Sequence, residues 1–189
     1  MSELLLEIVV AGKPEPQGST RAFVPTSKRG QPIRRPDGSV VVNVTSDNPA
    51  LKKWREKVAA AARAKWQGKP VDGISLMVEA DFFVRRPENH WGTGRNAHAL
   101  KDWAPAAPLM VPDSDKLLRA ALDSLTGVVY RDDSLVTLAI TEKHYAIPGE
   151  RNDGQGVILK VLRRDAQTAV DLPEAERVRH VAREQLALV

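Results

Sequence analysis

The segment Pro112–Ser134, PDSDKLLRAALDSLTGVVYRDDS, is the most informative part of the chain, because a helix pattern in it lies between two acidic pairs. Leucine and alanine recur at helical spacing through its first half, and Gly127 follows the last of them. The spacing predicts a helix that ends at Gly127 and a short strand at Val128–Tyr130. A helix followed by a strand reverses the chain, so we expect the two acidic pairs to lie close together.

Both acidic pairs consist of aspartates: Asp113 and Asp115 before the helix, Asp132 and Asp133 after the strand. Carboxylates that converge repel one another unless a cation lies between them, and Mg²⁺ prefers oxygen ligands. Arg119 follows Asp115 by one helical turn and is placed to contact a phosphate. Alone, each pair is also typical of a helix cap or a turn. Two pairs around one unit of a basic protein favour a metal site that hydrolyses phosphodiesters.

Outside this segment the chain alternates between predicted strands, helices and loops. A Pro-rich stretch at 85–111 predicts a long surface loop. Strands are predicted at 4–10, 74–84, 135–145 and 157–162, and helices from about residue 49 and at 174–188. The expected fold class is α+β, with a mixed or antiparallel sheet flanked by helices. We expect a single domain over residues 1–165 and a helical tail at 166–189.

Composition limits the chemistry available to this chain of 189 residues, which carries a formal net charge of +4. It contains no cysteine, which excludes disulfides, thiol nucleophiles and cysteine-ligated metal sites. Its four histidines have no zinc-ligand spacing. No stretch approaches the roughly 20 apolar residues that a membrane-spanning helix needs, so we expect an intracellular protein without a membrane partner. The positive charge permits nucleic-acid binding.

Basic side chains gather in the Gly- and Pro-rich segment 13–36, where Glu15 is the only acid, and a turn is predicted directly after it at Pro36–Gly38. We expect this segment to form a basic loop or long hairpin that contacts phosphates, against the alternative of an ordinary solvated loop. The residues predicted to bind DNA are Lys13, Arg21, Lys28, Arg29, Arg34, Arg35 and, beside the acids, Lys116.

The order of residues in Pro112–Ser134 resembles the signature of the RusA family of Holliday junction resolvases. That signature reads Asp-x-Asp-Asn, a Lys four residues after the second Asp, Leu-Asp-x-Leu, Gly and Asp-Asp-x-Gln-Val. The resemblance implies that Asp113, Asp115 and Asp133 are the catalytic metal-binding acids, with Asp132 preceding the third. Arg119 occupies the position of the catalytic lysine.

Three positions depart from the signature. Lys116 stands where the family has Asn, Arg119 where it has Lys, and Leu135 where it has Gln. An arginine keeps the charge of lysine but presents a planar fork instead of a point charge. A lysine beside the acids can pair with a carboxylate or bind phosphate.

The resemblance implies an endonuclease that uses Mg²⁺, with Mn²⁺ able to substitute, and resolves four-way DNA junctions by paired phosphodiester cleavage. It further implies a homodimer that serves DNA recombination and repair, and phage DNA processing in the cytoplasm of a bacterial host. Three alternatives remain open: a nuclease for other branched DNA, a catalytically weakened junction-binding protein, and a DxD-type transferase. The last lacks a recognisable nucleotide-binding loop.

Overall fold

A computed structural model describes residues 2–18, 20–46, 48–146 and 154–164 of the chain. The expected helix at 174–188 and the tail at 166–189 lie outside these residues. Within them, no helix is long and apolar enough to cross a membrane.

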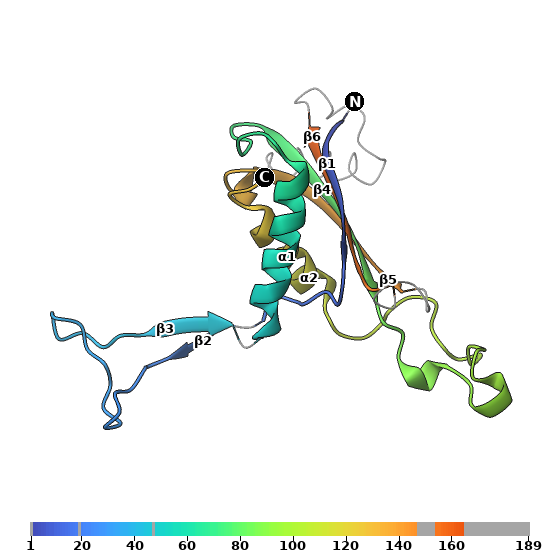
Figure 1. The fold of residues 1–189 in the computed structure, drawn as a ribbon, viewed down its shortest axis with the longest axis horizontal. Helices are drawn as coiled ribbons and strands as arrows, with labels where there is room; N and C mark the ends of the chain where they lie inside the picture. The colour runs from blue at the N-terminus through green and yellow to red at the C-terminus, as the bar shows by residue number, and fades with distance from the viewer. Residues whose placement is uncertain (1, 19, 47, 147–153, 165–189) are drawn as a thin grey trace, which may run out of the picture.

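The centre of the molecule is a four-stranded sheet of β1 (Glu3–Ala11), β4 (Ser75–Val84), β5 (Val136–Tyr145) and β6 (Gly156–Arg164). The strands follow the order β1-β6-β4-β5, and β4 and β5 pair in parallel while the other neighbours pair antiparallel (Figure 1). This mixed sheet confirms the predicted α+β class. The last two strands of the chain are not neighbours, because β4 lies between them.

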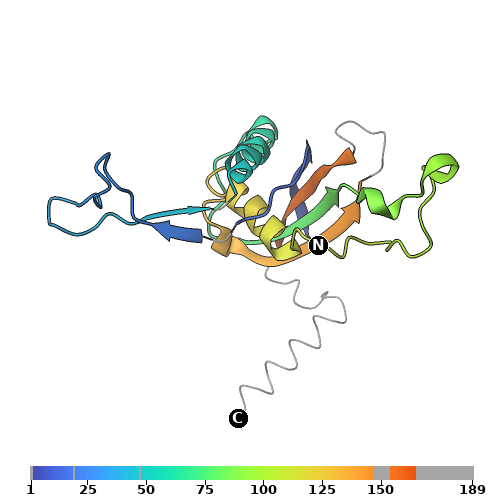
Figure 2. The ribbon, with the colours of Figure 1, turned by 90° about the horizontal axis from the view of Figure 1, so that it is seen from below.

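Two helices, α1 (Ala50–Lys65) and α2 (Ser114–Leu125), cover one face of the sheet (Figure 2). The alternating apolar residues of β1, β4 and β6 bury their side chains against these helices. Phe82 of β4, Val58 of α1 and Leu117 of α2 are fully buried there. Each such side chain contributes about 1.5–3 kcal/mol through burial, so this single core fixes α2 on the sheet.

Residues 128–130 do not form the predicted strand. Tyr130 makes only isolated bridges to Val71 and Thr126, and Val129 donates its N–H to the carbonyl of Leu125. Val129 and Tyr130 are fully buried. Their apolar character therefore reflects a turn packed into the core, which local hydrogen bonds and an isolated bridge to Val71 hold in place without a full strand.

Two extensions project from opposite sides of this body (Figures 1 and 2). One is the arm, residues 20–46, whose base is the antiparallel pair β2 (Thr20–Phe23) and β3 (Asn43–Ser46). This agrees with the long hairpin expected there. The other is the Pro-rich loop after β4, which contains the 3-10 turns η1 (Glu88–His90) and η2 (Gly94–Asn96). The chain enters α2 between the two extensions (Figure 1).

Candidate active site

The first turn of α2 carries the first acidic pair. Asp113 precedes the helix in an extended conformation, and Asp115 lies in the first turn. The buried face of α2 holds Leu117, Ala120, Ala121, Ser124 and Leu125. Because that face packs on the sheet, the side chains of Asp115 and Arg119 are exposed on the opposite side. The helix pattern thus directs both toward solvent, where a phosphate can approach.

Lys116 forms an ion pair with Asp113, with Nζ 2.8 Å from Oδ2. The hydrogen bond and charge of Lys116 lower the pKa of Asp113, and the charge of Lys143 adds to this effect. Reciprocally, Asp113 and then Asp115 raise the pKa of Lys116. The lysine that replaces the signature asparagine is therefore a direct counter-ion of a predicted metal ligand.

The second acidic pair lies on η3 (Asp133–Leu135), a single turn that contacts α2 just before β5 begins. Asp132 caps this turn, because its Oδ1 accepts the N–H of Ser134 at 2.9 Å. The side-chain hydrogen bond of Ser134, and after it this backbone bond, lower the pKa of Asp132. Burial raises the pKa of Tyr130, and the negative charge of Asp133 raises it further. The buried Tyr130, three residues before Asp133, donates its hydroxyl to the carbonyl of Leu122 of α2 at 2.9 Å.

The turn that leads to η3 is anchored at two points. The N–H of Arg131 donates to the carbonyl of Val71 at 2.9 Å, and its Nη1 lies 2.9 Å from Asp72 Oδ2. On the other side, α2 is tied to α1 by the ion pair of Arg55 with Asp123 at 3.4 Å. Asp123, which matches a helix position of the signature, thus serves the packing of the two helices.

The described residues contain one group of three ligand-type side chains whose donor atoms all lie within 4.8 Å, namely Asp81, Glu142 and His144. Asp113, Asp115 and Asp133 do not approach one another this closely. The group of three lies across the parallel pair β4 and β5, with His144 Nε2 at 3.6 Å from Asp81 and 3.4 Å from Glu142. Sequence spacing could not reveal it, since the parallel pairing creates it.

Lys143 is a residue of the site that the sequence did not single out. It lies on β5, and its Nζ donates to the carbonyls of Met110 at 2.9 Å and Pro112 at 3.0 Å. These bonds hold the end of the Pro-rich loop where the chain enters α2, and the charge of Lys143 also acts on Asp113. A lone lysine in a strand gives no sequence signal for such a contact.

The predicted basic residues fall into two places. Near the acids, the N–H of Gln17 donates to the carbonyl of Lys116 at 2.9 Å, so the segment after β1 passes the first turn of α2. Lys13 of that segment is exposed and pairs with Glu15 at 3.1 Å. Arg21 lies in β2, paired in register with Thr45 at the base of the arm.

The other basic residues lie on the arm beyond its two-stranded base. There the chain makes two tight turns, closed by the N–H of Gly30 on the carbonyl of Ser27 and that of Gly38 on Arg35, both at 2.9 Å. The exposed side chains of this part include Lys28, Arg29, Arg34 and Arg35. The structure thus separates four of the predicted phosphate contacts from the acids by the length of the arm (Figure 1).

The donors at this site fit a hard divalent cation. Asp113, Asp115, Asp132 and Asp133 offer only carboxylate oxygens, and the side chains of Asp115, Asp132 and Asp133 are open to solvent while that of Asp113 is half exposed. Mg²⁺ takes one or two carboxylates together with waters and phosphate oxygens, so it does not require a closed cage of protein ligands. Among the described residues at α2 and η3 there is no histidine that would favour a softer metal.

A known protein family matches the part of the chain that carries both acidic pairs. The family model described as "Endodeoxyribonuclease RusA" matches residues 23–151. The match covers more than half of the chain and includes most of the arm, both acidic pairs and Lys143. Comparison with curated proteins gave no match. The chain therefore belongs to the RusA family of endodeoxyribonucleases.

Proposed function

We propose that this protein is a Mg²⁺-dependent, structure-specific endonuclease that resolves four-way DNA junctions by paired cleavage. The observation that carries this proposal is the meeting of α2 and η3, which brings the turn with Asp133 against the helix that starts at Asp113 and Asp115. This arrangement lies inside the region matched by the endodeoxyribonuclease family.

In the proposed mechanism, Asp113, Asp115 and Asp133 hold Mg²⁺, with Asp132 beside them. Mn²⁺ is expected to substitute. When bound, Mg²⁺ activates a water and stabilises charge on the phosphate oxygens. Arg119, exposed one turn after Asp115, binds the phosphate that is cut. Lys116, half exposed beside Asp113, would also contact phosphate when its ion pair with Asp113 opens.

The two extensions support a branched DNA substrate. The arm presents Lys28, Arg29, Arg34 and Arg35 on one side of the acids, and the Pro-rich loop lies on the other side (Figures 1 and 2). Lys13 and Arg21 occupy the connection between the acids and the arm. The DNA duplexes that leave a junction in different directions would contact both extensions. Each phosphate whose charge the protein neutralises adds to the affinity.

We further propose that the protein acts as a two-fold homodimer, because a symmetric junction requires two symmetric cuts. The expected setting is recombination, repair or phage DNA processing in the cytoplasm of a bacterial host. A plasmid with an extruded cruciform tests the dimer. Paired cutting within one encounter yields linear product directly, whereas a monomer accumulates nicked circles.

A panel of labelled DNA substrates in Mg²⁺ tests the specificity: four-way junction, flap, replication fork and linear duplex. We expect the fastest cleavage on the four-way junction, with symmetric nicks in opposite strands. Faster cutting of the flap or the fork would replace junction resolution with the broader activity of a nuclease for branched DNA.

One observation favours a second candidate function, a junction-binding protein with weakened chemistry. In its ion pair with Asp113, Lys116 neutralises the charge of a proposed metal ligand. Under this alternative the wild type binds a four-way junction and cuts it neither in Mg²⁺ nor in Mn²⁺. Restored cleavage in Lys116→Asn would then identify the lysine as the cause.

A further inference from the structure

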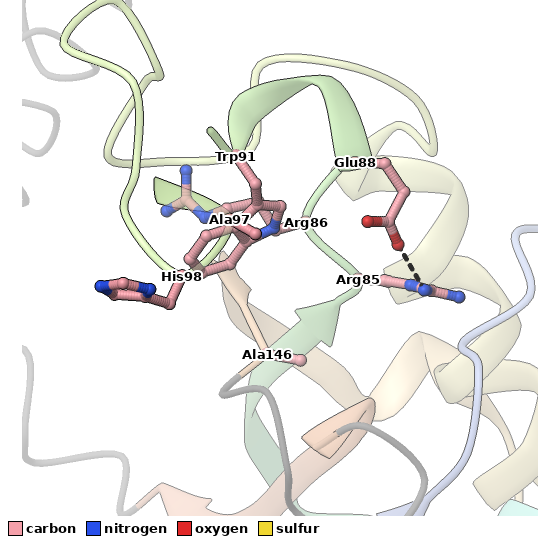
Figure 3. A pocket seen from close by; sticks show the side chains of 7 residues that line it. All are labelled: Arg85, Arg86, Glu88, Trp91, Ala97, His98 and Ala146. Atoms are coloured by element: carbon pink, nitrogen blue, oxygen red, sulfur yellow. Dashed lines mark hydrogen bonds and ion pairs between the residues drawn. The ribbon is translucent and has the colours of Figure 1, made fainter. Parts of the chain in front are cut away.

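The Pro-rich loop lines an open hollow of about 450 Å³ beside the end of β5 (Figure 3). Its walls include Arg85, Arg86, Glu88, Trp91 and His98. In the close-up, Trp91 and Arg86 lie in the middle, with His98 on one side and the Arg85–Glu88 ion pair on the other (Figure 3). The volume falls within the range of about 300–1,000 Å³ typical of ligand sites.

Backbone hydrogen bonds hold one wall in place. Trp91 and Leu100 form a bridge, and the N–H of Gly92 donates to the carbonyl of Ala99 at 2.9 Å. A Cβ at Gly92 would lie 2.3 Å from the carbonyl oxygen of Asn96, so the turn closes as tightly as glycine allows. The turn thereby returns the chain and places His98 on the same hollow as Trp91.

Aromatic packing anchors the base of the hollow on β5. The guanidinium of Arg86 lies 3.7 Å from the ring centroid of Tyr145, and its Nη1 donates to the carbonyl of Pro105 at 2.9 Å. The buried ring of His90 packs edge-on against Tyr145 and Trp103. A site built from such contacts binds with less loss of conformational entropy than a loose loop would.

The side chains in the walls match an unpaired nucleotide. The flat indole of Trp91, the imidazole of His98 and a guanidinium plane are surfaces on which single bases stack. Glu88 accepts hydrogen bonds of the kind that base amino groups donate. Two arginines and one glutamate give the walls a net positive charge, which favours binding of the phosphate of the same nucleotide. A stacked base pair inside a duplex has no free face for such a hollow.

A second, smaller hollow connects this place with the proposed active site. It measures about 170 Å³, shares Arg85 with the first, and continues past Met110 to Pro112, which directly precedes Asp113. A DNA strand held at the acids can therefore continue along this surface toward Trp91. The shared wall makes the two places parts of one binding track.

We propose that the hollow lined by Trp91 and His98 binds one unpaired nucleotide of the DNA substrate, on the strand that passes the acids. This inference rests on the proposed function, because it assigns a subsite to its substrate. It predicts that the enzyme prefers branched DNA whose bases are unpaired near the branch. Base stacking would thus add structure selectivity to the charge-based binding of the arm.

Binding of a fluorescein-labelled oligothymidylate of about eight nucleotides, a length suited to one groove, tests the proposal. The measurement is anisotropy without divalent cations, beside a linear duplex. We expect Trp91→Ala to lower affinity for the single strand at least about fivefold and leave the duplex unaffected. Trp91→Phe retains most of the affinity, because it keeps a flat face. His98→Ala, at an exposed position, lowers it about twofold or more.

Arg95→Ala is the matched control, since Arg95 is an exposed cation of the same loop outside the hollow. Wild-type affinity of both Trp91→Ala and His98→Ala for the single strand overturns the proposal, as does an equal loss for duplex and single strand. Asp115→Asn separates this test from that of the endonuclease. It abolishes cleavage if the catalytic proposal is right, yet the ratio of single-strand affinities with and without the Trp91→Ala change stays the same in this background.

Discussion

Lys116 Nζ lies 2.8 Å from Asp113 Oδ2 at the point where α2 begins, so a cation of the protein occupies the first proposed metal ligand. Both side chains are about half exposed, and the pair is therefore open to exchange with solvent ions. Any divalent metal at Asp113 has to compete with this lysine. The relationship makes metal affinity the property of the site that is most sensitive to a single substitution.

Lys116→Asn, which restores the signature residue, is expected to tighten Mg²⁺ binding up to about fivefold, the range set by exposed ion pairs. Isothermal titration calorimetry with Mg²⁺ measures the change directly. Lys116→Arg serves as the control, because it retains the positive charge. Equal Mg²⁺ affinity in the wild type and Lys116→Asn would show that the ion pair does not compete with the metal.

Lys143 is expected to position the acids through the backbone, since its ammonium bonds the carbonyls of Met110 and Pro112. Lys143→Met should reduce single-turnover cleavage by about tenfold or more, as displacements near 1 Å can do. Junction affinity measured without divalent cations should change little. Partial rescue by Lys143→Arg would support positioning by hydrogen bonds. A loss confined to affinity would instead assign Lys143 to DNA binding.

The arm is expected to supply sequence-independent phosphate contacts. Replacing both Lys28 and Arg29 by alanine should reduce the slope of log affinity against log salt on duplex DNA, by about 0.9 for each phosphate that the variant no longer neutralises. Replacing both Arg63 and Lys69 by alanine, exposed cations at and beyond the other end of α1, is the control for the loss of two positive charges. An unchanged slope in the double variant of Lys28 and Arg29 would mean that the arm does not touch the DNA backbone.

Tyr130 is expected to make stability depend on pH in the alkaline range. Burial raises its pKa above the ordinary value of 10.0, so it stays protonated in the folded state while the unfolded chain ionises. The stability is fully present below about pH 10 and falls above it, by up to about 1.4 kcal/mol per pH unit. Urea unfolding at neutral and alkaline pH measures this loss.

Tyr130→Phe should remove that alkaline dependence and cost about 0.5–1.5 kcal/mol at neutral pH, because the hydrogen bond to Leu122 is removed. The carbonyl of Leu122 keeps the N–H of Thr126 as a partner, which limits the cost. Tyr145→Phe, which retains Tyr130, should keep the steep decline. Equal alkaline decline in Tyr130→Phe and the wild type would contradict the assignment.

Sequence patterns predicted most of the elements because their burial follows the local period. Alternating residues identify β4, and the leucine and alanine spacing identifies α2. The same patterns misread Val128–Tyr130, because an apolar run does not distinguish a strand from a buried turn. The order of the strands could not be predicted from these patterns either, because β6 lies between β1 and β4 through contacts between residues distant in sequence.

The candidate site, like the fold, could be predicted from the sequence only in part. The positions of Asp113, Asp115 and Arg119 at the start of a helix follow from spacing alone. The contact of Lys143 with the loop depends on tertiary packing, as does the group formed by Asp81 and His144 across a parallel strand pair. The hollow at Trp91 arises from a turn closed by backbone bonds, which side-chain patterns do not encode.

Cleavage of a labelled synthetic four-way junction in Mg²⁺, with linear duplex as the substrate control, decides whether the protein is the proposed endonuclease. The wild type is compared with Asp115→Asn and with Asp102→Asn, the same change at an exposed loop position. We predict symmetric nicks on the junction alone, abolished in Asp115→Asn and kept in Asp102→Asn. A wild type that binds the junction but never cuts it, even in Mn²⁺, or full activity of Asp115→Asn, would contradict the proposed site.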